Sequence, residues 1–156
     1  MRGIEKSMVK KNKYTSPLCV GRGKGKFILN LNQYRNAHFR KTNTAKHRYK
    51  EFMREQITKL KGKVDKALFI YTVYKGDKRS FDIGNIVSIH QKFFEDAMVE
   101  LGRLSEDKYS VIPMFIGCFG GIDKDNPRVE IEVVEAGKGF KEDVIKTIKL
   151  KLEELY

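Results

Sequence analysis

The run KALFIYTVY, residues 66–74, restricts the possible folds of this chain more than any other segment. It is short and combines aliphatic, β-branched and aromatic residues, which is typical of a strand buried in a sheet. Residues 108–119 and 128–136 are predicted as two further strands. In the last of them, three valine or isoleucine residues on one face alternate with two glutamates on the other. A sheet is therefore the expected centre of the fold.

Three segments have the residue spacing of amphipathic helices. In residues 45–60 the apolar side chains recur on one face, lysines and arginines occupy the rest, and Asn43 or Thr44 is the expected N-cap. A second apolar stripe runs through residues 86–101, and residues 139–156 form a third amphipathic segment. These helices are expected to cover the sheet.

The remaining segments complete the predicted order. Residues 26–33 alternate weakly and are predicted as a strand, whereas residues 34–44 have no period and are predicted as a loop. The order is then β-α-β-α-β-β-α, an α/β (α+β) fold with one mixed sheet. Residues 1–24 are basic and contain glycine, which predicts a flexible arm, and residues 25–156 are expected to form one domain.

Several classes of protein are disfavoured by the sequence. It has no stretch near the roughly 18 apolar residues of a membrane span, and its first residues lack the apolar centre of a secretory signal. We therefore expect a cytoplasmic protein with no membrane partner. Cys19 and Cys118 have neither paired spacing nor nearby histidines, which favours free, buried thiols over a zinc site or a disulfide.

The positive charge is concentrated at one end of the chain. Residues 1–66 hold 19 Lys or Arg and four acidic residues, a net charge of +15, whereas residues 67–156 have a net charge of −3. Aromatic residues are interspersed in the basic half, among them Tyr14, Phe27, Tyr34, Phe39 and Tyr49. Such an excess favours a polyanionic partner. Nucleic acid is the stronger candidate, because no early segment combines a wide apolar face with a basic face.

Carboxylates stand at both ends of the helix predicted around residues 86–101. Asp82 precedes it, with Gly84 permitting close backbone approach, and Glu106 and Asp107 follow it. A helix of that length holds its ends about 25–30 Å apart, so these acids meet only if the helix is shorter or a second subunit contributes one end. From spacing alone, an N-cap role for Asp82 and turn roles for the other two are favoured.

Four polar residues inside the same helix have expected positions. His90 lies on the apolar stripe and is expected to pack in the core. Glu95 is expected to be in solvent, and Asp96 to be half-buried beside the stripe. Lys92, one turn before Asp96, is expected to pair with it or to reach a phosphate.

A resemblance covers residues 25–136. The motif DIGN, then Lys92 with Asp96-Ala97-Met98 behind it, then ELGRLSED resembles the core signature of the RusA-type Holliday junction resolvases. These are small endonucleases common in phages and prophages. The segment LNQYRNAHFRKTNTAK is similar to the basic segment of the phage members, and NPRVEIEVVE resembles their last strand. The resemblance implies a mixed α/β homodimer in a bacterial or phage-infected cell.

The resemblance also implies a function: Mg²⁺-dependent cutting of four-way or branched DNA in recombination, repair or phage DNA processing, with Mn²⁺ as a substitute metal. It implies catalytic roles for Asp82, Asp107 and Lys92, the lysine stabilising charge on the phosphate. The implied metal ligands are Asp82, Asp107, Glu106 and Asp96. The implied DNA-binding residues are Arg35, His38, Arg40, Lys41, Lys46, Arg48 and Asn85.

The chain departs from the family signature at one acid. Gly84 stands where the family has its second carboxylate, and about one extra helical turn separates Asn85 from Lys92. Three hypotheses therefore stay open. The first is a branched-DNA endonuclease, and the second is a non-catalytic branched-DNA-binding protein with a degenerate site. The third is an unrelated basic domain associated with RNA or ribosomes.

Overall fold

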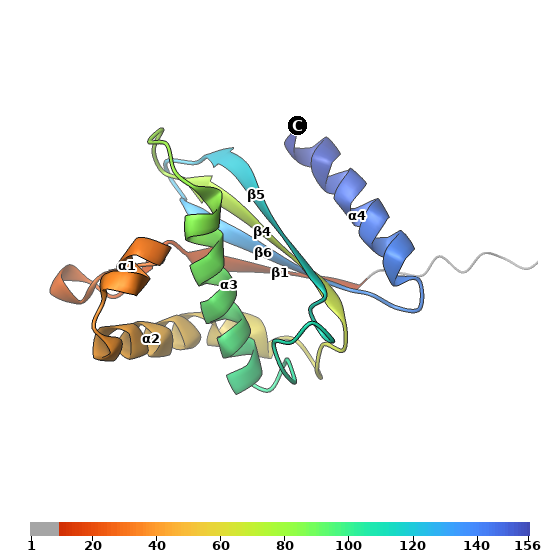
Figure 1. Cartoon of the computed structure of the whole chain (residues 1–156), viewed down its shortest axis with the longest axis horizontal. Coiled ribbons are helices and arrows are strands. Elements are labelled where there is room, and N and C mark those ends of the chain that lie inside the picture. The colour runs from red at the N-terminus through yellow and green to blue at the C-terminus, as the bar shows by residue number, and fades with distance from the viewer. Residues whose placement is uncertain (1–9) are drawn as a thin grey trace, which may run out of the picture.

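The structure, a computed structural model, describes residues 10–156 (Figure 1). Its strands are β1 (Lys10–Pro17), β2 (Cys19–Val20), β3 (Phe27–Ile28), β4 (Ala67–Lys75), β5 (Met114–Ile122) and β6 (Arg128–Glu135). Its α-helices are α1 (Leu31–Asn36), α2 (Phe39–Thr58), α3 (Ile83–Glu100) and α4 (Phe140–Leu155). A short 3₁₀ turn, η1 (Gly23–Gly25), separates β2 from β3.

Four strands form the central sheet in the order β1-β6-β4-β5. Strand β4 runs parallel to β5 and antiparallel to β6, and β1 is antiparallel to β6. The first seven residues of β4 are buried, as the apolar run predicts. Strands β2 and β3 form a separate pair. The sheet is therefore mixed, with β1 and β5 at its two edges.

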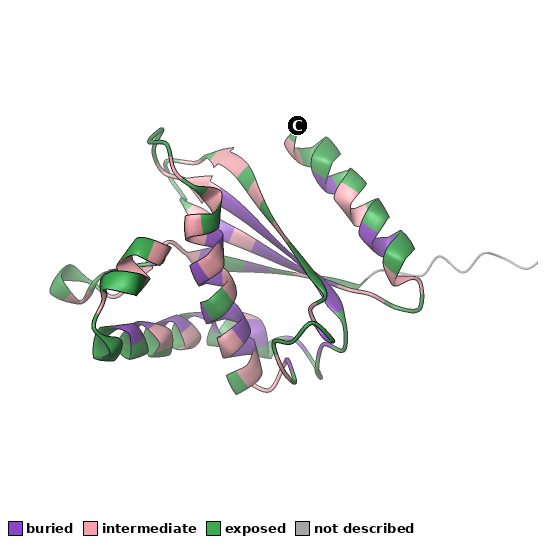
Figure 2. Cartoon of the chain, in the orientation of Figure 1, coloured by how far each residue is buried: buried purple, intermediate pink, exposed green. Residues whose placement is uncertain are grey.

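The two faces of the sheet are covered by different helices (Figures 1 and 2). Helices α2 and α3 pack on one face, and α4 lies across the other. The first face holds the main core, whose largest side chains include Phe27, Tyr49, Phe69, Tyr71, Phe93 and Phe94. The α4 face holds a small cluster of four buried residues: Leu68, Ile70, Val134 and Val144. Most of the apolar burial thus lies between the sheet and the α2–α3 pair.

The predicted fold class is confirmed, because one mixed sheet is combined with helices in a single domain-like body. The predicted strands and helices from β4 onward are present, and the three apolar positions of β6 face the core as expected. Both cysteines are free, as predicted, but only half-buried. Within residues 10–156, no helix has the length and apolar character to cross a membrane.

The predicted flexible arm over residues 1–24 is wrong for the part that the structure describes, while residues 1–9 lie outside it. Residues 10–17 form β1, paired along its whole length with β6. Tyr14 and Ser16 point into the core, while Lys11 and Lys13 point to the other face. The period-two pattern of a strand is present in the sequence, but its lysines are also typical of a solvent-exposed tail, and only Tyr14 and Ser16 of this edge strand are buried.

The prediction for residues 26–44 is also corrected. Only Phe27–Ile28 is strand, Leu31–Asn36 is helical, and α2 begins at Phe39 rather than near residue 45. The N-cap of α2 is His38, whose Nδ1 accepts a hydrogen bond from the Arg40 amide at 3.3 Å. Because the first turn of α2 is mostly exposed, it carries no apolar period that would have revealed it.

Candidate nucleic-acid interface and acidic group

Exposed cations gather on α1, on the turn between β2 and β3, and on the first half of α2. We call this the basic surface; its residues are Arg22, Lys24, Lys26, Arg35, Arg40, Lys41 and Arg48. None of them forms an ion pair with a carboxylate of residues 10–156. The sequence has no acidic residue between Glu5 and Glu51, so the region lacks internal neutralisation. Such a surface attracts polyanions.

Two hydrogen bonds fix the parts of the basic surface relative to one another. The guanidinium of Arg48 donates to the carbonyl of Gly25 at 2.9 Å, which ties α2 to the turn after β2. The side-chain oxygen of Asn85 accepts from the amide of Leu31 at 2.8 Å, which ties α1 to the start of α3. Asn85, predicted to contact DNA, therefore has a structural role, and a DNA contact stays a prediction.

Helices α2 and α3 are joined by two ion pairs. The ammonium of Lys46 lies 3.3 Å from Asp96, and that of Lys50 lies 2.7 Å from Glu100. Asp96 is half-buried, as predicted, but its partner is Lys46 rather than Lys92. Lys92 is exposed and forms no ion pair in the described chain. The predicted DNA contact of Lys46 would therefore compete with Asp96.

Asp82 caps the first turn of α3. Its Oδ1 accepts a hydrogen bond from the Gly84 amide at 2.8 Å, which confirms the N-cap role. A Cβ added at Gly84 would lie 3.3 Å from that same oxygen. Gly84 occupies the position where the RusA-type signature that the sequence resembles has its second acid. A side chain at this position would be crowded by the Asp82 carboxylate in this conformation.

The acids after α3 are separated from Asp82. Glu106 pairs with Lys108 at 3.0 Å and accepts a hydrogen bond from Ser110, while Asp107 is exposed. Helix α3 has 18 residues and is therefore about 27 Å long. Residues 10–156 contain no group of three or more His, Cys, Asp or Glu side chains placed to hold a metal ion. The four predicted ligands do not fit one metal site within a single chain.

Glu95 is buried, and the prediction that its side chain lies in solvent is wrong. Its side chain is buried, at 5% relative exposure, and accepts a hydrogen bond from the Tyr71 hydroxyl at 3.2 Å. Burial raises its pKa to about 7, the charges of Asp107 and Asp96 add to the rise, and hydrogen bonds from Gln91 and Tyr71 oppose it.

The charges of Asp96 and Asp107 therefore act on Glu95, and we call these three residues the acidic group. Two of the four predicted ligands belong to it, while Asp82 lies at the other end of α3. The apolar stripe of the helix does not predict the burial of Glu95, because this residue lies beside the stripe, three residues before Met98 and four after the polar Gln91.

His90 packs in the core as predicted. It is fully buried, and its Nδ1 lies 2.7 Å from the Ser16 hydroxyl, which in turn lies 2.7 Å from the Tyr49 hydroxyl. Burial lowers the pKa of His90 to about 3, so the ring is neutral near pH 7. These three side chains resemble parts of a catalytic triad but are closed to substrate, and their role is structural.

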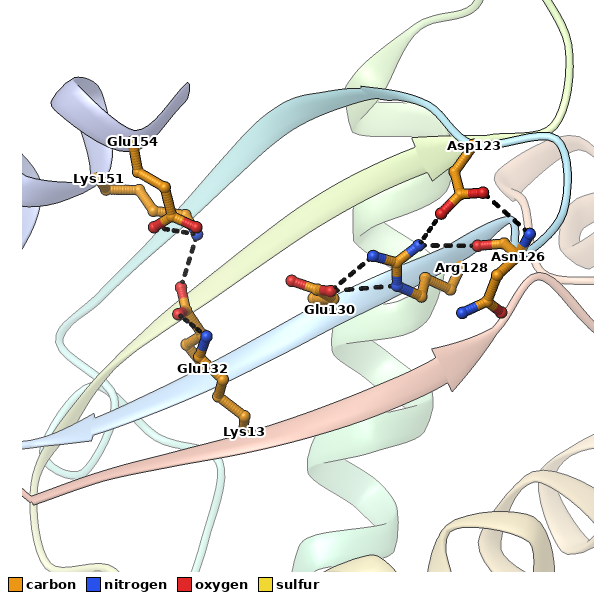
Figure 3. A network of polar contacts seen from close by, with 8 residues as sticks. All are labelled: Lys13, Asp123, Asn126, Arg128, Glu130, Glu132, Lys151 and Glu154. Carbon is orange, nitrogen blue, oxygen red and sulfur yellow. Dashed lines mark hydrogen bonds and ion pairs between the residues drawn. The ribbon is translucent and has the colours of Figure 1, made fainter. Parts of the chain in front are cut away.

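The opposite face of the sheet carries a network of ion pairs (Figure 3). Glu132 is bound by Lys11 at 2.7 Å and by Lys151 of α4 at 3.0 Å. Next to the loop that connects β5 and β6, Arg128 contacts Asp123 and Glu130 at 2.8 Å each. The charges of this network are paired within the chain, in contrast to those of the basic surface.

The comparisons with known proteins give no family assignment. No model of a known protein family matches the sequence, and no curated protein sequence matches it either.

Proposed function

We propose that this protein is a structure-selective, Mg²⁺-dependent endodeoxyribonuclease that acts on four-way and other branched DNA as a homodimer. The observation that carries the proposal is the basic surface, where seven exposed cations have no carboxylate partner among residues 10–156. Phosphate oxygens are the natural partners of such groups, and they position a protein on DNA without reading its sequence.

The position of the acidic group supports the nuclease part of the proposal. Lys46 lies on α2 between Lys41 and Arg48 of the basic surface, and its ammonium contacts Asp96 of the acidic group. DNA bound along α2 would therefore lie close to Asp96 and the other carboxylates of the acidic group. A buried carboxylate with a raised pKa beside two further acids is typical of functional sites.

The open edge of the sheet supports a homodimer. Strand β5 has no charged residue, and four of its apolar side chains are exposed: Met114, Phe115, Phe119 and Ile122. The other edge, β1, is protected by lysines and by Gln56, which bonds both backbone groups of Thr15. Unprotected edge strands readily pair with another chain, and we infer that a second copy covers β5. A two-fold dimer also matches the symmetry of a four-way junction.

The nuclease proposal is tested by incubating the protein with a labelled synthetic junction and Mg²⁺, Mn²⁺ or EDTA. We expect paired nicks that disappear with EDTA and fall at least about a hundredfold in Asp82→Asn and Asp107→Asn, with DNA binding kept. Lys92→Ala should impair cutting far more than binding. Asp125→Asn, in the exposed β5–β6 turn, is the matched control.

A non-catalytic branched-DNA-binding protein is the second candidate. It is favoured by Gly84 and by the absence of a three-ligand metal group in residues 10–156. Tight junction binding without nicks at any Mg²⁺ or Mn²⁺ concentration would establish it in place of the nuclease. Equal displacement of the junction by structured RNA would favour an RNA-associated domain instead.

The role of the basic surface is tested by charge removal. The triple variant with Ala at Arg35, Arg40 and Lys41 should weaken junction binding and reduce the salt slope by about 2–3, since about one counterion is released per phosphate contact. A triple variant at Lys59, Lys61 and Lys63 removes the same charge just beyond the C-terminal end of α2 and should leave the slope unchanged. Equal effects of both variants would reject the basic surface as the DNA contact.

The dimer is tested by sedimentation equilibrium. Phe115→Glu places a charge on the exposed edge strand and should shift the protein toward monomer. Tyr109→Glu alters an exposed aromatic residue in the loop before β5 and should not. A wild-type protein that stays monomeric at all concentrations would contradict this part of the proposal.

A further inference from the structure

Phe39 is an aromatic side chain that the fold leaves in solvent. Of the six aromatic residues in residues 1–66, Tyr14, Phe27 and Tyr49 are buried, Tyr34 is half-buried, and Phe39 and Phe52 are exposed. Phe39, the first residue of α2, is 63% exposed and is the most exposed phenylalanine of residues 10–156. Its ring does not belong to the main core, so the ring is free to contact a partner.

The immediate surroundings of Phe39 are aromatic and cationic. The ring of His38 lies 4.5 Å from it between centroids, at an interplanar angle of 37°. The guanidinium carbon of Arg40 lies 5.9 Å from the centre of the Phe39 ring. Arg35 and Lys41, both of the basic surface, are close in sequence, and no acidic residue lies nearby in the chain before Glu51. An apolar protein partner would have to bury these cations, which is costly.

A second exposed phenylalanine on the same helix provides a contrast. Phe52 is 57% exposed, but it follows Glu51 and precedes Glu55, and Glu51 binds Arg54 at its side. Helix α2 thus carries one exposed ring in a purely cationic setting and one in a mixed, partly neutralised setting. Only the first ring is suited to a partner that offers flat apolar rings together with negative charge.

We propose that Phe39, supported by His38, stacks on an unpaired base of branched DNA while the neighbouring cations hold the flanking phosphates. The inference rests on the proposed DNA-binding function and deepens it, since it names which DNA structure is preferred. Bases that are unpaired at a branch point offer a free face for stacking, whereas bases within a continuous duplex do not. Aromatic stacking of this kind accepts any base and confers preference for structure rather than sequence.

The absence of tryptophan from the sequence makes a direct test simple. Phe39→Trp and Phe52→Trp each introduce a single tryptophan, at two positions of the same helix. On titration with a junction carrying two unpaired thymines at its branch point, fluorescence of the first variant should be strongly quenched. Fluorescence of the second variant should change little, and a fully paired duplex should quench neither variant strongly.

Binding measurements give an independent readout. Phe39→Ala should weaken binding of the unpaired junction by about tenfold and of paired duplex by much less, because one stacked base is lost. Its salt slope should stay that of the wild type, since stacking releases no counterions, unlike removal of Arg40 and Lys41. Phe52→Ala should match the wild type in both respects. Circular dichroism checks that these exposed positions leave the helix intact.

The possible failures are distinguishable. If the wild type binds the junction but both tryptophan variants respond alike, or Phe39→Ala binds as the wild type does, the stacking role is rejected and the proposed function survives. If the wild type binds no branched DNA at all, the proposed function and the stacking role are rejected together.

Discussion

Two buried glutamates on opposite faces of the same sheet are treated by this fold in opposite ways. Glu132, under α4, is 1% exposed and is contacted by the ammonium groups of Lys11 and Lys151. Burial acts to raise its pKa, but hydrogen bonds and charges of those lysines outweigh it and hold the pKa below its usual value. Glu95, on the α2–α3 face, has no cationic partner among residues 10–156, and its pKa is about 7.

The difference separates a structural carboxylate from a candidate functional one. Glu132 is neutralised inside the chain and fastens α4 to the sheet, so its charge is fully used by the fold. Glu95 is placed beside Asp96 and Asp107, where its ionisation is unfavourable. A fold that keeps such a group gives up stability at neutral pH, and sites that do so are commonly functional.

The largest expected effect concerns Glu132. Glu132→Leu should lower the free energy of unfolding by about 3 kcal/mol, because Lys151 stays buried and keeps only the half-exposed Glu154 as a partner. Chemical denaturation at pH 7 measures this change. The double variant with Lys151→Met should recover most of the loss, since an apolar pair of similar size replaces the ion pair. A double variant as unstable as the single one would show that packing, rather than the unpaired ammonium, causes the loss.

Glu95→Gln should raise the free energy of unfolding, whereas Glu132→Leu lowers it. The folded-state pKa of about 7 lies above the ordinary value of 4.5, so the stability contributed by the protonated side chain is present below pH 4.5 and is lost as the pH rises through 7. The variant should therefore match the free energy of unfolding of the wild type at pH 4 and exceed it by about 3 kcal/mol at pH 8, since each pKa unit corresponds to about 1.4 kcal/mol.

Urea unfolding at the two pH values measures this difference. Glu153→Gln, at an exposed position of α4, should show no such pH dependence and serves as the control. If the free energy of unfolding changes equally between pH 4 and 8 in the wild type and in Glu95→Gln, ionisation of Glu95 does not destabilise the fold. The contrast with Glu132 would then disappear.

The two glutamates also show which parts of the fold the sequence could predict. The alternation around Glu132 predicted the correct strand and the correct apolar face, because period-two patterns are set locally by backbone geometry. That β1 pairs with this strand was missed, since its lysines suggested a soluble tail. Their partner is a glutamate more than a hundred residues away, which no local pattern reveals.

The candidate site was predictable in parts. The basic half and the cap role of Asp82 follow from composition and from position before a helical period, and the structure bears out the cap. Burial of Glu95 depends on how α3 packs against Tyr71 of β4, which is tertiary information. The exchange of partners, in which Lys46 rather than Lys92 binds Asp96, likewise depends on the packing of α2 against α3.

Asp82 is a third kind of carboxylate. It is exposed, forms no ion pair with a cation of residues 10–156, and accepts a hydrogen bond from the backbone of its own helix. Substitutions of Asp82 therefore give the smallest expected change in stability. Asp82→Ala should lower the free energy of unfolding by about 1 kcal/mol through loss of the cap, whereas Asp82→Asn should change it by less than about 0.5 kcal/mol, since asparagine caps equally well. Thermal denaturation of both variants measures this. Loss of junction cutting in Asp82→Asn would then reflect the missing charge and not a damaged helix, whereas a large stability loss in Asp82→Asn would remove that distinction.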